Sequence, residues 1–442
     1  MIETEQVLLK FRGLKLISFK RRGYGEFVGT GLLNPLYDRF RLFRLIIMLL
    51  LESSFYKNSP FIGRWKGKRV SNTFAPPVGS HPQLRAFKGL VRNYLLGYSY
   101  PVACTFAVTY KCQCKCVHCS AGKHVRRGLE ELSTEEAKRV IDESQKLGVT
   151  IIAFTGGEPL LRDDIFELIA HVDKKKAMPI MFTNGQFLSE ENAQKLVDAG
   201  LYSLFVSIDS PVPEEHDKLR GVPGLFNDAI EGIKRMKSKG VFVNLSSYAI
   251  RSSTERGMYK KLYQLAKELD LDNFILFDGV PTGAMLKNVD EMLTPEQRQE
   301  IYEYSAKLFK ETAKPPLSSQ SWQNSIEAYL AGIGCLAANI QFYITAYGDI
   351  APCDFTPLSF GNIRKEPLKK IWRRMISHPA YSHRSPVCRM QNPKFRQVYI
   401  DPIPEDAKLP YDIKKLPLID YRKIKLEEKK EIHETIMKQI IT

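Results

Sequence analysis

The sequence predicts an α/β fold in which parallel strands form a partial (βα)6 barrel, preceded by a basic N-terminal region and followed by a small β-rich C-terminal domain. Short β-rich runs alternate with helical stretches, and this alternation favours a parallel sheet with right-handed crossovers. Only about 190 residues carry the alternation, fewer than the ~250 residues of a complete eight-fold barrel. We therefore expect reactive side chains at the carboxyl ends of the strands.

Six strands are expected at residues 105–109, 150–154, 179–182, 203–208, 241–248 and 273–277. The helices expected between them span residues 134–148, 165–175, 189–199, 225–239 and 254–269. Ser133 and Glu136 have the spacing of a capping box at the start of the first helix. Gly200 and Gly240 are placed to end two of the others.

The chain of 442 residues divides into five expected segments. These are a basic amphipathic region at 1–98, the barrel at 99–290, a helical linker at 291–330, a cysteine-containing domain at 331–392 and a tail at 393–442 that ends in a charged helix. Residues 1–100 hold 17 Lys and Arg against 5 Asp and Glu, which is most of the formal charge of +16. Such asymmetry indicates either an acidic partner for this region or a solvated basic surface.

The eight cysteines are expected to be reduced thiols in the cytoplasm. Residues 1–20 lack the apolar stretch and small-residue cleavage site that are typical of a secretory signal. The longest apolar run, residues 45–51, is far shorter than the ~20 residues that span a bilayer. Clustered cysteines in a reducing compartment indicate metal binding.

Three cysteines, Cys112, Cys116 and Cys119, follow the first expected strand with C-x3-C-x2-C spacing. A loop this short can wrap three thiolates around one face of an iron–sulfur cluster and leave one iron open. Zinc is the alternative, although structural zinc sites usually pair two ligand doublets. Cys114 is expected to point away from the cluster, and Cys104 is expected to be a small buried residue of the strand.

This loop, together with Gly156-Gly157-Glu158-Pro159 directly after the second strand, resembles the radical S-adenosylmethionine (SAM) superfamily over residues 103–285. The resemblance implies that SAM chelates the open iron of a [4Fe-4S] cluster and yields a 5′-deoxyadenosyl radical that abstracts hydrogen from a substrate. It also implies an external reductant such as ferredoxin or flavodoxin. The two glycines should let the backbone approach the ligand closely.

Polar residues at later strand ends are the remaining candidates for SAM binding. Ser207 and Asp209 end the fourth strand, and the resemblance places them near the ribose and the methionyl group. Asn184 ends the third strand, where it can also serve as a turn former before Gly185. On the fifth strand, Ser246 and Asn244 alternate with apolar residues, and Arg251 beyond it could meet a carboxylate: these complete the predicted set.

A second cysteine set, Cys335, Cys353 and Cys388, resembles the shortened auxiliary-cluster domain called the twitch domain. The resemblance implies a second [4Fe-4S] cluster, whose fourth ligand is substrate, water or a non-cysteine side chain. Such a cluster can accept an electron from a product radical or bind the substrate, and the sequence does not separate these roles.

Two substrate classes compete. The first is a lipid or other apolar substrate at an anionic membrane surface, modified oxidatively or by carbon–carbon bond formation, because cations flank residues 42–51 and surround Trp65. This predicts a peripheral position on the inner face of the cell membrane. The second is a peptide or protein, since the turn Pro281-Thr282-Gly283-Ala284 resembles a segment frequent in crosslink-forming relatives. Porphyrin side-chain modification is a further alternative.

A non-enzymatic function, as a basic electron carrier or RNA-binding protein, is the remaining alternative. A carrier needs no SAM site, so the turn at Gly156–Pro159 argues against it. No stacking-aromatic sheet or recognition motif for nucleic acid is visible in the sequence. The sequence therefore favours an enzyme.

Overall fold

The computed structural model describes residues 5–11, 14–22, 26–29, 61–96, 99–126, 128–324 and 334–424. Residues 45–51, and most of the charged helix predicted at 419–441, lie outside this part of the chain. No helix in the described part is long and apolar enough to cross a membrane. The predictions of a membrane surface, of a cytoplasmic location and of the five segment boundaries stay predictions.

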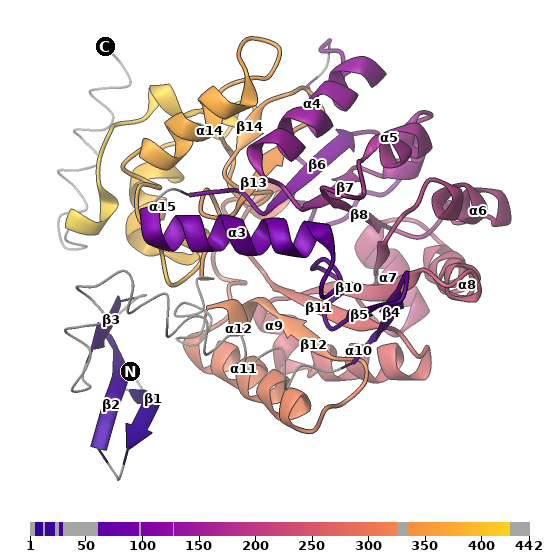
Figure 1. Ribbon diagram of the computed structural model, residues 1–442, viewed down its shortest axis with the longest axis horizontal. Coiled ribbons are helices and arrows are strands. Elements are labelled where there is room, and N and C mark those ends of the chain that lie inside the picture. Colours follow the sequence, from indigo (N-terminus) through magenta and orange to yellow (C-terminus); the bar gives the residue numbers. More distant parts are fainter. Residues whose placement is uncertain are drawn as a thin grey trace.

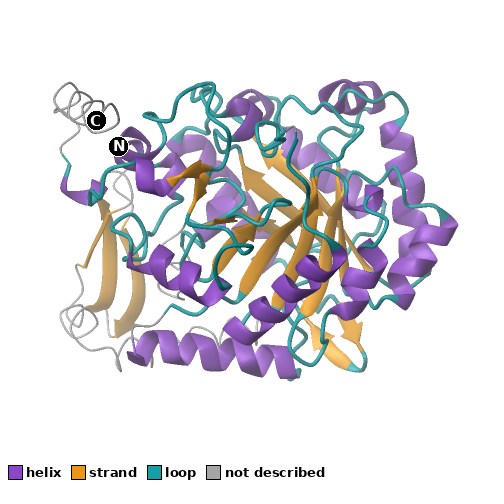
Figure 2. Ribbon diagram, turned by 90° about the horizontal axis from the view of Figure 1, so that it is seen from above, coloured by secondary structure: helices purple, strands orange, loops and turns teal. Residues whose placement is uncertain are grey.

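A nine-stranded sheet forms the centre of the molecule, in the order β12-β11-β10-β9-β8-β7-β6-β13-β14 (Figure 1). All neighbouring pairs from β12 to β13 are parallel, and only β13 and β14 are antiparallel. The predicted fold class is therefore confirmed. Figure 2 shows the strands gathered at the centre with helices along the outside.

The six predicted strands are present, and their bounds are β6 (Ala103–Thr109), β7 (Ile151–Gly156), β8 (Met178–Thr183), β9 (Ser203–Ser207), β10 (Phe242–Ala249) and β11 (Asn273–Asp278). The helices between them are α4 (Thr134–Leu147), α5 (Ile165–His171), α6 (Glu190–Asp198), α7 (Pro213–Arg220), α8 (Leu225–Ser238), α9 (Arg251–Glu255) and α10 (Met258–Glu268). The capping box of Ser133 and Glu136 is formed. Gly257, in the left-handed region, separates α9 from α10 where one helix was predicted.

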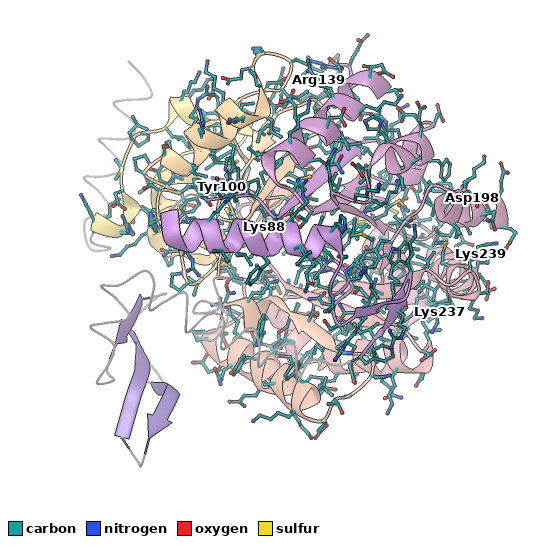
Figure 3. All side chains as sticks on the ribbon, viewed as in Figure 1. Lys88, Tyr100, Arg139, Asp198, Lys237 and Lys239 are labelled. Atoms are coloured by element: carbon teal, nitrogen blue, oxygen red, sulfur yellow. The ribbon has the colours of Figure 1, made fainter. Side chains whose placement is uncertain are left out.

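The helices bury apolar stripes on the outer face of the sheet and expose charge to solvent. In Figure 3, Asp198 of α6 and the lysines at the end of α8, Lys237 and Lys239, lie on the outer surface. Lys239 pairs with Glu190 at 2.6 Å, which links α8 to α6 at their exposed side. Such exposed pairs contribute only ~0–1 kcal/mol, so buried apolar contacts hold this layer.

The C-terminal residues continue the same sheet. Their elements are α11 (Pro295–Lys310), β12 (Leu317–Ser319), α12 (Gln320–Gln323), β13 (Gln341–Ile344), β14 (Ile350–Ala351), β15 (Leu358–Ser359), α14 (Leu368–Ser377), α15 (Pro393–Tyr399) and β16 (Tyr411–Asp412). The cysteine-containing domain joins the barrel because β13 pairs with β6 in parallel.

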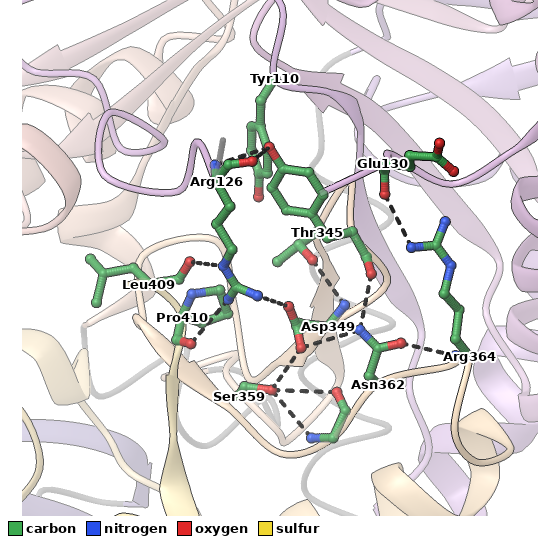
Figure 4. Close-up of polar contacts among 12 residues, drawn as sticks. Tyr110, Arg126, Glu130, Thr345, Asp349, Ser359, Asn362, Arg364, Leu409 and Pro410 are labelled. Carbon is green, nitrogen blue, oxygen red and sulfur yellow. Dashed lines mark hydrogen bonds and ion pairs between the residues drawn. The ribbon is translucent and has the colours of Figure 1, made fainter. Parts of the chain in front are cut away.

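Arg126, which follows the first cysteine loop, fixes this domain to the barrel (Figure 4). Its guanidinium forms an ion pair with Asp349 at 2.9 Å and donates to the carbonyls of Leu409 and Pro410. Asp349 also accepts a hydrogen bond from Asn362 at 3.3 Å. The loop that leaves the first cysteine set is thus tied to two separate segments of the C-terminal domain.

The N-terminal elements include a three-stranded antiparallel sheet, β1 (Glu5–Phe11), β2 (Leu14–Arg22) and β3 (Glu26–Gly29). A hairpin follows, β4 (Gly63–Trp65) and β5 (Lys68–Val70), and then α3 (His81–Leu96). The hairpin fills the inside of the barrel: Val70 is fully buried against the inward-facing residues of β7 to β11.

The expectation that Trp65 belongs to a membrane-binding surface is wrong. Its ring meets that of Tyr202 edge-on, with 5.1 Å between the ring centroids, and the centroid of the Phe242 ring lies 6.4 Å away. Tyr202 and Phe242 both belong to the apolar cluster inside the barrel. Its cationic neighbours Lys66 and Lys68 are exposed at the rim. The alternation of cations and apolar residues marks a hairpin that is buried on one side.

We expect the substitution Trp65→Ala to lower the free energy of unfolding by about 2–3 kcal/mol. This is less than the ~3–5 kcal/mol for a fully buried tryptophan, because the ring is only half-buried. Urea unfolding followed by circular dichroism measures the change, with Lys66→Ala as the exposed neighbouring control. Unchanged stability together with lost binding to anionic vesicles would restore the membrane interpretation.

Candidate active site

The first cysteine set lines a cavity of about 740 Å³ at the carboxyl ends of the barrel strands. The loop that carries Cys112, Cys116 and Cys119 is held by backbone hydrogen bonds from outside itself. Lys115 N donates to Arg220 O at 2.8 Å, and Cys119 O accepts from Ala284 N at 2.9 Å. Gly283 lies so close that a side chain there would meet Cys119 O at 2.2 Å. The turn at 281–284 therefore supports the cysteine loop.

Cys114 does not point away, so that prediction is wrong. It lines the same cavity. Its thiol lies within hydrogen-bonding reach of the side chains of both Cys112 and Cys116. Alternation along an irregular loop does not fix side-chain direction as it does along a strand.

The glycines of the turn after β7 have a structural role in addition to the predicted one, which stays a prediction. A Cβ on Gly156 would meet Thr109 O at 2.1 Å, and a Cβ on Gly157 would meet Lys111 O at 2.2 Å. Gly157 N also donates to Thr109 O at 2.8 Å. Both glycines line the cavity, but the close approach they permit is that of the cysteine loop itself.

We expect Gly157→Ala to displace the cysteine loop, because the carbonyl of Lys111 cannot accommodate a methyl group at that distance. The iron content of the first site should fall after anaerobic reconstitution, as measured by a colorimetric iron assay. Gly89→Ala in α3 is the matched control, since its nearest atom outside the helix, Tyr100 Cβ, would lie 3.7 Å away. Full iron content in Gly157→Ala would contradict this explanation.

Glu158 and Pro159, both predicted to bind the cofactor, do not line the cavity. Glu158 is fully buried and accepts hydrogen bonds from Thr183 Oγ1 and Asn184 N, each at 2.8 Å. Burial raises the pKa of this carboxyl. The Glu158 side chain therefore braces the end of β8, and Pro159 begins the short helix η1 (Pro159–Leu161) below the turn.

The structure brings the other predicted residues together. Asn184, Ser207, Asp209 and Ser246 all line the cavity. Asn184 caps its own turn through Oδ1, which accepts from Gln186 N at 3.0 Å, while its Nδ2 is buried and has no partner among the described residues. Such an atom fits a ligand acceptor. Asn244, by contrast, donates to Ser203 and Leu204 on the neighbouring strand.

Arg220 is a cation of this site that the sequence analysis missed. It ends α7, lines the cavity and pairs with Asp209 at 2.8 Å, both residues being buried. Arg251, which was expected to meet a carboxylate, lies exposed at the start of α9. A guanidinium beside Cys116 can hold the carboxylate of SAM. Helix α7 has almost no apolar residues, so hydrophobic periodicity does not indicate this helix, or the place of Arg220 at its end, in the sequence.

The second cysteine set opens onto the same cavity. Cys335, Cys353 and Cys388 are buried and line it too, and burial raises the pKa of Cys353 and Cys388. Thr356 Oγ1 lies 3.1 Å from Cys353 Sγ, and the backbone N–H of Cys388 donates to Asn324 at 3.1 Å. Two triads of thiols thus face one space.

Aromatic and acidic side chains also line the cavity. The ring of Phe277 meets that of Phe355 edge-on, with 5.8 Å between the ring centroids. The centroid of the Phe182 ring lies 6.3 Å from that of Phe277. Asp278 and Asp354 add two carboxylates. Burial raises the pKa of both, that of Asp354 to about 6.

Both triads fit iron–sulfur clusters by the chemistry of their donors, because thiolates are the ligands that such clusters prefer. In the described part of the chain, no three His, Cys, Asp or Glu side chains converge closely enough to hold a single metal ion.

Comparison with known proteins assigns the family. Residues 106–282 match the radical SAM superfamily, and residues 335–391 match an iron–sulfur cluster-binding domain, SPASM. The AdoMet-dependent heme synthase of Nitratidesulfovibrio vulgaris is 30% identical over 285 residues, which cover 60% of this chain and 77% of that protein. The chain belongs to the radical SAM superfamily. It is therefore an enzyme, with SAM and two iron–sulfur clusters as cofactors.

Other similarities of this radical SAM enzyme extend to peptide-modifying proteins. The PqqA peptide cyclase of Granulibacter bethesdensis is 25% identical over 281 residues, covering 62% of this chain and 74% of that protein. The structure of SuiB from Streptococcus suis bound to its precursor peptide SuiA superposes with a TM-score of 0.53 and 19% identity over 66% of this chain and 69% of that one. At that identity, the match shows a shared fold.

Proposed function

We propose that this radical SAM enzyme oxidatively modifies an unactivated carbon in an apolar side chain of a peptide or protein. The observation that carries the proposal is the single cavity onto which both cysteine triads open, together with the aromatic side chains that line it. A side chain that enters this cavity would lie between the radical source and a second redox centre. When bound, the cluster of Cys112, Cys116 and Cys119 supplies the electron that cleaves SAM to a 5′-deoxyadenosyl radical.

The charges of the cavity support a substrate without multiple carboxylates. Lys115 and Arg220 are the cations among its described lining residues, and Arg220 is already paired with Asp209. Asp278 and Asp354 also line the cavity, but Arg298 lies 3.9 Å from Asp278 and burial raises the pKa of both carboxyls, so neither adds a strong negative charge. A coproporphyrin, which carries several carboxylates, would find only Lys115 and the paired Arg220 as cations among the described lining residues.

The lipid alternative has lost part of its support. Trp65 packs inside the barrel, and residues 45–51 lie outside the described part of the chain. The aromatic wall of Phe182, Phe277 and Phe355 suits an apolar side chain of a peptide as well as an alkyl chain. The similarity to a peptide cyclase supports the peptide.

Hydrogen transfer to the cofactor provides the test. Reconstituted enzyme, SAM and dithionite are incubated with peptide, lipid or tetrapyrrole fractions from cells grown in deuterated medium. Mass spectrometry of the 5′-deoxyadenosine then shows which fraction donated deuterium. We expect label from the peptide fraction, and its loss after protease digestion of that fraction.

The variant that lacks Cys112, Cys116 and Cys119 is the control, because it cannot cleave SAM in any fraction. Label from the lipid fraction alone would overturn the proposal and favour the alkyl-chain alternative. Label that persists after complete protease digestion would likewise exclude a folded or extended peptide as the substrate.

Porphyrin side-chain modification is the second candidate, because the heme synthase relative has 30% identity. It requires acidic groups of the substrate to bind near Lys115 and Arg220 rather than near Asp278. Pure Fe-coproporphyrin III in the same assay decides it: decarboxylated product would favour this candidate over the peptide.

A further inference from the structure

Arg389 is a fully buried guanidinium that directly follows Cys388, in the short helix η3 (Arg389–Gln391). Its Nε donates to Ala380 O at 2.9 Å, and its Nη2 donates to His383 O. The ring of Tyr381 lies 4.9 Å from the guanidinium carbon. The remaining nitrogen, Nη1, is buried and has no hydrogen-bond partner among the described residues.

This cation lacks the counter-charge that a buried cation normally needs. Arg220 pairs with Asp209 at 2.8 Å, and Arg396 lies 3.7 Å from Asp401, but no carboxylate of the described chain pairs with Arg389. An uncompensated buried charge costs several kcal/mol. The group beside Arg389 is the thiol of Cys335, which lies within hydrogen-bonding reach of the guanidinium.

A cluster bound by Cys335, Cys353 and Cys388 would supply the missing negative charge. Its thiolates are anionic, and the unpartnered Nη1 could donate to one of these sulfur ligands. We infer that Arg389 hydrogen-bonds to the Cys335 ligand and raises the reduction potential of the auxiliary cluster, so that this cluster accepts the electron released by the substrate radical.

The physical basis is the stabilisation of added charge. Reduction adds one electron to a cluster, and a positive charge in a low-dielectric interior stabilises the reduced form. Hydrogen bonds to cluster sulfurs act in the same direction. At the first triad, by contrast, the charge of Arg220 is neutralised by Asp209. Among the described side chains, a guanidinium without a carboxylate partner therefore lies beside the auxiliary triad, whereas the guanidinium beside the first triad has one.

The electrons balance when the auxiliary cluster accepts one. The substrate C–H bond breaks, and its hydrogen atom passes to the deoxyadenosyl group. The resulting substrate radical gives one electron to the auxiliary cluster and one proton to solvent, which completes a two-electron oxidation. The external reductant system takes the electron back from the auxiliary cluster.

A redox titration followed by electron paramagnetic resonance tests the inference. In the Cys112→Ala/Cys116→Ala/Cys119→Ala background, only the auxiliary cluster remains. We expect Arg389→Gln to lower its midpoint potential and Arg389→Lys, which keeps the charge, to lower it less. Arg374→Gln is the control, since Glu366 binds that guanidinium at 2.6 Å. An unchanged potential in Arg389→Gln would overturn the inference.

A second measurement needs no substitution at Arg389. The same triple variant is grown with ¹⁵N-arginine, and the reduced auxiliary cluster is examined for hyperfine coupling to nitrogen. Coupling is expected from a guanidinium that donates to a sulfur ligand, and its absence would contradict the contact even if Arg389→Gln failed to fold. The electron-acceptor role rests on the proposed oxidative function, but both measurements use no substrate, so each proposal can fail separately.

Discussion

The Cys112→Ala/Cys116→Ala/Cys119→Ala variant should lose SAM cleavage entirely and retain about four of about eight irons per chain. The three thiolates line the cavity together, and no other set of cysteines in the described chain can replace them at that end. Chromatography of 5′-deoxyadenosine after reduction with dithionite measures cleavage. Iron analysis measures the loss of one cluster.

Two further substitutions serve as controls for this result. Cys104→Ala should change neither quantity, because Cys104 is buried on β6 away from the cavity lining. Cys114→Ala tests the additional thiol that lies beside Cys112 and Cys116. Cleavage that survived in the triple variant would contradict the assignment of the first cluster.

The second large effect is expected for Arg220→Met. Removing one partner of a buried ion pair leaves Asp209 uncompensated, which costs about 3–5 kcal/mol of stability. The same change removes the cation that we assign to the carboxylate of SAM. Thermal unfolding and equilibrium dialysis with labelled SAM measure the two losses independently.

The double variant Asp209→Asn/Arg220→Met separates these effects. Stability should largely recover, because the buried carboxylate is gone, whereas SAM binding should stay weak. Arg256→Met is the matched surface control, since its ion pair with Glu215 is partly exposed. Normal SAM affinity in Arg220→Met would contradict the assigned role.

The sequence predicted the barrel because each strand–helix unit carries its own local signals. The box of Ser133 and Glu136 and the turn at Gly200 depend on neighbouring residues alone, so both could be identified in the sequence. The cysteine spacings were equally local. Contacts between distant segments could not be read in this way, and the hairpin at Trp65 was therefore assigned to a membrane surface.

The missed residues of the site share the same cause. Arg220 and Arg389 gain their roles from Asp209 and Cys335, respectively, which lie elsewhere in the chain. Glu158 sits in a recognised motif, but its hydrogen bonds to Thr183 and Asn184 turn it away from the cavity. The motif therefore predicted that Glu158 lies near the site, but it did not predict the direction of the side chain.

The parallel pairing of β13 with β6 has a consequence for the two cysteine sets. Thr105 and Tyr343 are partners in this ladder, and Tyr110 Oη lies 3.1 Å from Tyr343 Oη just beyond it. The strand that precedes the first cysteine loop and the strand between Cys335 and Cys353 are thus paired in one hydrogen-bonded ladder. A substitution that disturbs the pairing of β6 with β13 would therefore affect both cysteine sets.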